Sequence, residues 1–73
     1  MDQEEIDQIQ HILDVIHSQN DGLTDVIANA KHAIDIESGL LEVWLSLIAG
    51  LALNSTTIEL TGEERQVLRG WVR

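Results

Sequence analysis

Two pairs of acidic residues and histidines in the first quarter of the chain have spacings that could bind a metal ion. Asp7 and His11 are four residues apart, and Asp14 and His17 are three apart. In a helix, these spacings place both members of each pair on neighbouring turns, as carboxylate-bridged metal sites of helical bundles require. The ligands of such sites point into the bundle, whereas Asp7, His11 and Asp14 fall opposite the apolar positions of the same segment. We therefore expect a solvated polar face here, with no metal and no cofactor.

The hydroxyl and carboxyl groups of the chain form no catalytic pattern. A serine nucleophile needs an activating base beside it, and no sequence signature surrounds Ser18, Ser38, Ser46 or Ser55. Glu42 is the most notable acid because it interrupts an apolar segment, but a single glutamate near a helix start is ordinary. We predict that the protein is not an enzyme and has no catalytic residues.

Charge is strongly unbalanced along the chain. Thirteen Asp and Glu residues face four Lys and Arg residues, which gives a net charge of −9 at pH 7. Direct binding to nucleic acid is disfavoured because Lys and Arg supply most of the affinity for phosphate. Two helical stripes remain candidates for electrostatic contact with a partner or another copy. The acidic stripe is Glu4, Asp7 and Asp14, and the basic stripe is Arg65, Arg69 and Arg73.

The first half of the chain predicts two amphipathic helices. The first helix extends from Asp2 to about Ser18, with apolar residues at the three- and four-residue spacing of one helical face. Gly22, in an Asn-Asp-Gly turn, is expected to take a positive φ. The second helix is expected from Thr24, as its N-cap, to Glu37. Gly39 is expected to end it in the left-handed conformation.

The segment from Leu40 to Leu53 predicts a helix that is apolar almost all round. Its few interruptions, Glu42, Ser46 and Gly50, are spaced by four and form one narrow stripe. Fourteen helical residues span only about 21 Å, which is too short for a hydrocarbon layer of about 30 Å. Such a helix must be covered on almost every side, so we expect it at the centre of the fold.

A fourth helix is expected after a connector at residues 54–60. Thr61 and Glu64 match a capping box, in which each side chain bonds the backbone N–H of the other. The stretch LTGEERQVL, residues 60–68, resembles the opening of the first helix in LuxR-type DNA-binding domains. That resemblance would imply a recognition helix farther along the chain. Because the sequence stops at Arg73, we interpret the match as the shared pattern of a capped amphipathic helix.

Size and composition predict a single all-α domain, residues 1–73, built as a compact bundle of three to four helices. A chain of 73 residues without cysteine has neither disulfides nor thiolate zinc sites to support a small core. We therefore expect a homodimer with two-fold symmetry. Its interface is expected to include Leu41, Trp44, Leu45, Ser46, Ile48 and Gly50.

The leading functional hypothesis is a small, acidic, non-catalytic interaction protein. It would act as a regulator, inhibitor or accessory subunit on a larger macromolecular partner whose identity the sequence does not give. Mimicry of nucleic acid by the carboxylates is one form of the inhibitor hypothesis, and small size with acidity suggests a phage or mobile-element origin. The alternative is a membrane-peripheral protein that uses helix 40–53. The N-terminal residues lack a secretory pattern, so we expect a cytoplasmic protein without a membrane span.

Overall fold

The computed structural model describes residues 2–72, and these form four α-helices without any strand. The α-helices are α1 (Gln3–Gln19), α2 (Thr24–Asp35), α3 (Leu41–Asn54) and α4 (Gly62–Trp71), with a short 3₁₀ turn, η1 (Asp21–Leu23), before α2. The prediction of a compact all-α bundle is confirmed.

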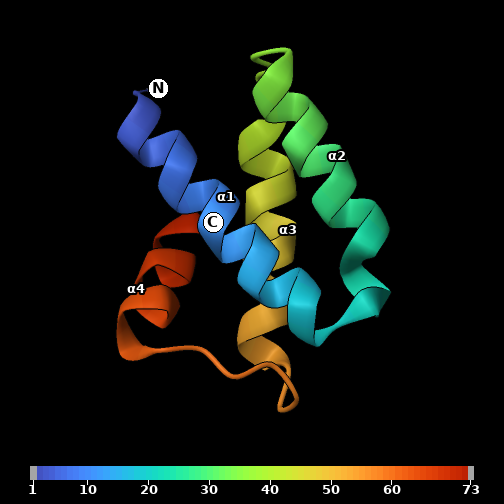
Figure 1. Cartoon of the computed structure of the whole chain (residues 1–73), viewed down its shortest axis with the longest axis vertical. Helices are drawn as coiled ribbons and strands as arrows, with labels where there is room; N and C mark the ends of the chain where they lie inside the picture. The colour runs from blue at the N-terminus through green and yellow to red at the C-terminus, as the bar shows by residue number, and fades with distance from the viewer. Residues whose placement is uncertain (1, 73) are drawn as a thin grey trace.

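The helices pack around one shared apolar core. α3 packs against both α2 and α4, and α1 packs against α2. In Figure 1, α1 crosses obliquely in front of α3, and α2 and α4 lie on opposite sides of α3. The buried residues are all apolar: Ile9, Ile12, Leu13, Ile16, Ile27, Ala30, Ala33, Ile34, Leu41, Leu45, Ile48, Ala49, Ala52, Ile58 and Leu68.

The helix expected from Asp2 is present, and its predicted face is buried. The Asp2 side chain caps α1 by accepting a hydrogen bond of 2.9 Å from the backbone N–H of Glu5. Ile9, Leu13 and Ile16 lie in the core. The three- and four-residue spacing places these side chains on one face because a helix completes a turn every 3.6 residues.

The turn between α1 and α2 differs from the prediction in two respects. No glycine among residues 2–72 has a positive φ, and Gly22 lies within η1. Asn20 shapes this turn, because its side chain accepts a hydrogen bond of 2.8 Å from the Gly22 N–H. Thr24 is not an N-cap but the first residue of α2, and its hydroxyl donates to the carbonyl of Asp21 at 2.6 Å. The 3₁₀ turn η1 directly precedes α2, so Thr24 lies within a helical segment instead of capping its start.

The end of α2 also differs from the prediction. The left-handed residue is Glu37, with φ of 51°, rather than Gly39. The N–H of Ser38 bonds the Ala33 carbonyl at 2.9 Å, and the N–H of Glu37 bonds the Ile34 carbonyl at 3.2 Å. These two bonds form a Schellman motif, in which the residue after the C-cap is left-handed. The helix therefore ends two residues earlier than glycine placement suggested, and Glu37 adopts a conformation that disfavours side chains with a Cβ.

The predicted capping box at the start of α4 is confirmed. Thr61 Oγ1 accepts from the Glu64 N–H at 3.1 Å, and Glu64 Oε1 accepts from the Thr61 N–H at 2.9 Å. The connector before it is fixed by Gln19 at the end of α1. The Gln19 side chain accepts from the Glu59 N–H at 2.7 Å and donates to the Glu59 carbonyl at 2.8 Å. This pair of bonds holds the connector where Ile58 enters the core.

Candidate interaction surface

The outward side of α3, together with its N-cap residue Leu40, carries an exposed row of large apolar side chains, which we call the outer row. Its members are Leu40 at 61% exposure, Val43 at 61%, Leu47 at 46% and Leu51 at 43%. Successive members are three or four residues apart, so they follow one side of the helix over about 16 Å. Single exposed leucines are common on protein surfaces. Four on consecutive turns form a contiguous patch, which is the kind that marks interaction sites.

Three of the six residues of the predicted interface lie on the inward side of α3. Leu41, Leu45 and Ile48 are buried in the core of this one chain. They contribute to folding, and the single chain does not present them to a partner. The structure also does not confirm α3 as a central helix, because its outer row lies at the surface. The sequence does not separate these buried residues from the exposed apolar residues of α3, because all of them have similar hydropathy.

The other three predicted interface residues flank the outer row. Trp44 lies on one flank, is half-buried and packs against the core. Ser46 and Gly50 lie on the opposite flank and are also half-buried. A Cβ added at Gly50 would meet open space, so nothing in the chain itself requires glycine there. Glycine in a helix interior costs about 0.5–1 kcal/mol relative to alanine, and no close contact among the described residues offsets this cost at Gly50.

Exposure of the outer row to water is unfavourable in free energy. Full burial of a leucine or valine side chain contributes about 1.5–3 kcal/mol. Since each residue of the row is roughly half exposed, the four together forgo on the order of 4 kcal/mol. A domain of this size has a total stability of only about 3–5 kcal/mol. A partner that covers the row would therefore stabilise the chain appreciably.

The acidic stripe lies on the outward side of α1, remote from the core. Glu4, Asp7 and Asp14 are all exposed. Asp7 accepts a hydrogen bond of 2.9 Å from Gln3, and Asp14 accepts one of 2.6 Å from Lys31 on α2. The Lys31 contact links two helices and reduces the negative charge at one end of the stripe.

The basic stripe is only partly described by the structure. Arg65 is half-buried and Arg69 is exposed, and among the described residues neither takes part in an ion pair. Arg73 lies outside the described residues. Among residues 2–72, no ion pair joins Arg65 or Arg69 to the acidic stripe, and pairing between copies stays a prediction.

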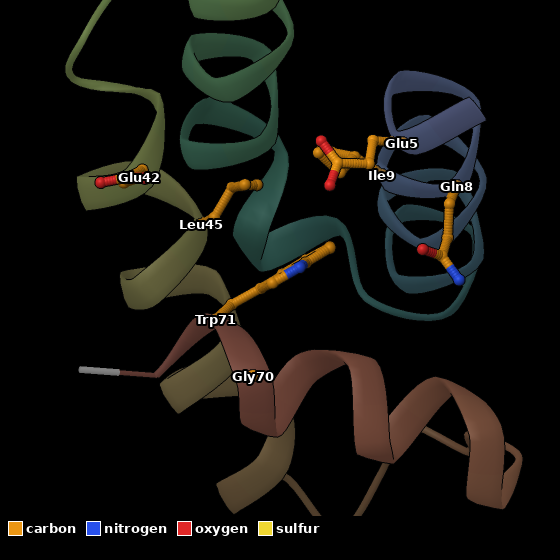
Figure 2. A pocket seen from close by; sticks show the side chains of 7 residues that line it. All are labelled: Glu5, Gln8, Ile9, Glu42, Leu45, Gly70 and Trp71. Carbon is orange, nitrogen blue, oxygen red and sulfur yellow. The ribbon is translucent and has the colours of Figure 1, made fainter. Parts of the chain in front are cut away.

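A shallow hollow opens where α1, α3 and α4 meet. Figure 2 shows the Trp71 indole extending from α4 toward α1, below Leu45. Glu5 points into the space between α1 and α3, whereas Glu42 points away from Trp71. The full lining is Glu5, Gln8, Ile9, Glu42, Leu45, Gly70 and Trp71. This lining contains no serine, threonine or histidine, and its two carboxylates, Glu5 and Glu42, come from different helices.

The histidines near the start of the chain take part in separate contacts between elements. His11 Nε2 lies 3.7 Å from Glu64 Oε2 on α4, and His17 Nε2 lies 3.2 Å from the hydroxyl of Thr24. Within residues 2–72 there is no group of three or more His, Asp or Glu side chains placed to hold a metal ion. No helix in that range is long and apolar enough to cross a membrane.

Comparisons with protein-family models, with curated proteins and with solved structures found no match.

Proposed function

We propose that this chain is a small, acidic, non-catalytic interaction protein whose docking surface is the outer row of α3. Its role is that of a regulator, inhibitor or accessory subunit, which acts by assembling with another protein. The observation that carries this proposal is the outer row itself: Leu40, Val43, Leu47 and Leu51 stay exposed although they are large and apolar.

The chemistry of the outer row favours a protein surface as its occupant. The row contains no charged side chain, and from Leu40 to Leu53 the one charged residue is Glu42. Nucleic acid would need cationic groups for its phosphates. A protein helix or groove offers apolar side chains that fit between the ridges of α3. The carboxylates of α1 lie elsewhere and serve solubility and approach to positively charged partners.

Paired capture from host extract tests the proposal. The bait is the intact chain, compared with Leu47→Glu, which places a charge in the middle of the outer row. Ala28→Glu is the matched control because Ala28 is exposed on α2 and the added charge is the same. We expect a protein that the wild type and Ala28→Glu both retain and that Leu47→Glu loses. If every protein that the wild type retains is also retained by Leu47→Glu, the outer row is not a docking surface.

A membrane-peripheral role is the second candidate, and the same exposed row favours it. An amphipathic helix lying on a membrane combines apolar residues with Lys or Arg on its polar face. α3 has no Lys or Arg, and the chain has a net charge of −9, which anionic headgroups repel. Flotation with neutral and anionic vesicles separates the two candidates. Vesicle binding that Leu47→Glu abolishes would support the membrane role and contradict docking to a protein.

A further inference from the structure

We infer that the occupant of the outer row is a second copy of this chain, paired through α3 in an antiparallel arrangement with Leu47 at the two-fold axis. This inference rests on the proposed function, because it names the partner of the same surface. Three observations carry it: the symmetry of the apolar positions, the placement of charge, and the small residues on one flank.

Val43, Leu47 and Leu51 of the outer row are self-complementary about Leu47. When two antiparallel copies of α3 cross at Leu47, that residue meets its own counterpart. Val43 then lies opposite Leu51 of the second copy, since the two positions are equally far from Leu47. In this central part of the contact apolar side chains therefore face apolar side chains, as an isologous interface requires, whereas at each end Leu40 lies opposite Asn54 of the other copy. The Trp44 flank of each copy adds a half-buried aromatic ring, and both rings lie at the same edge of the contact.

The placement of charge favours the antiparallel over the parallel arrangement. Two copies with a net charge of −9 each repel one another, so they associate best through a surface that lacks carboxylates. The outer row is such a surface. In the antiparallel pair the two Glu42 backbones lie about 15 Å apart along the helix axes, which exceeds the screening length of about 8 Å at physiological salt. A parallel pair would place both Glu42 side chains at the same level and align the two helix dipoles unfavourably.

The flank formed by Ser46 and Gly50 allows the two helices to approach closely. In the antiparallel pair this flank meets the same flank of the second copy, so small residues line both sides of one edge. Gly50 has open space around it in the single chain. A second helix backbone at that edge would explain why position 50 is a glycine, because small residues permit close contact between helices.

Sedimentation of the intact chain at increasing concentration tests the pairing. We expect a species of twice the 8.1 kDa chain mass to form over the micromolar range, and to form more readily at high salt because salt screens the repulsion between copies. Binding to a positively charged foreign protein would show the opposite salt dependence. Leu47→Glu should raise the dimer dissociation constant about a hundredfold. Ala28→Glu should leave it within a factor of about three.

A charge-swap mixture tests the geometry itself. Leu47→Glu and Leu47→Lys each place like charges together at the two-fold axis, so each alone should be a helical monomer. When mixed they should form a heterodimer, because residue 47 then meets an opposite charge. Circular dichroism of each variant checks that the exposed substitution leaves the fold intact.

The outcomes separate the pairing from the proposed function. A wild type that sediments at 8.1 kDa at every concentration and salt overturns the pairing. If that monomer still captures a protein that Leu47→Glu loses, the docking surface stands with a different occupant. A wild-type dimer that Leu47→Glu leaves unchanged, or a mixture that stays monomeric, overturns pairing through Leu47.

Discussion

The two sides of α3 have nearly the same composition and opposite environments. Leu41, Leu45 and Ile48 are buried against α2, α4 and the other core residues, whereas Leu40 and Leu47, next to them in sequence, are exposed. Neighbours in a helix point about 100° apart, so adjacent apolar residues can serve different purposes. The inward side contributes to the stability of the single chain, and the outward side is the surface that we propose for assembly.

The test with the largest expected effect compares alanine substitutions at two neighbouring residues, one on each side of α3. Ile48→Ala should lower the free energy of unfolding by about 3–4 kcal/mol, because it removes buried methyl groups and leaves a cavity. Leu47→Ala should change it by less than about 0.5 kcal/mol in the monomer, because that side chain is already half in water. Urea denaturation at low protein concentration measures both changes in the free energy of unfolding. Equal losses would mean that the outer row contributes to folding and would remove the basis for the docking surface.

The next test concerns the contact between the Gln19 side chain and the backbone of Glu59 in the connector before α4. Gln19→Ala should lower the free energy of unfolding by about 1–2 kcal/mol, because it removes both bonds to the Glu59 backbone. Thermal denaturation measures the loss. Gln19→Glu keeps the acceptor but replaces the donor to the Glu59 carbonyl, so it should fall between wild type and Gln19→Ala. No change in Gln19→Ala would show that burial of Ile58 alone holds the connector.

A smaller effect, of opposite sign, is expected at the junction that leads into α3. Glu37→Gly should raise the free energy of unfolding by about 0.5–1 kcal/mol, because glycine takes the left-handed conformation without the Cβ penalty. The glycine also loses more entropy on folding, which limits the gain. Glu37→Ala is the matched control, since it removes the same charge but keeps the Cβ. A gain in both variants would assign the effect to charge at the helix C-terminus instead of to backbone strain.

An effect of similar size separates folding from assembly on the outward side of α3 itself. Gly50→Ala should raise the free energy of unfolding of the monomer by about 0.5–1 kcal/mol, because alanine is the better helix former and a Cβ there meets open space. The measurement is chemical denaturation at a concentration below self-association. A loss of stability would mean that Gly50 is required within the single chain and would weaken its assignment to the assembly flank.

Local hydrogen bonds explain which parts of the fold the sequence predicted. The capping box of Thr61 and Glu64 depends on residues three positions apart, so its spacing is visible without a structure. Ile9, Leu13 and Ile16 were recognisable as core residues because polar residues separate them at helical spacing. At the end of α2, Gly39 was the expected left-handed residue, but the backbone bonds of the Schellman motif place that conformation at Glu37.

The sequence by itself determined that this is a helical chain, with four α-helical segments and an excess of apolar residues at positions 40–53. Only the tertiary structure decided which side of α3 faces inward. A helix that is apolar almost all round has no amphipathic signal to orient it, so its neighbours select the buried side. The clamp of Gln19 on Glu59 joins residues forty positions apart, and only the packing of distant segments brings them together.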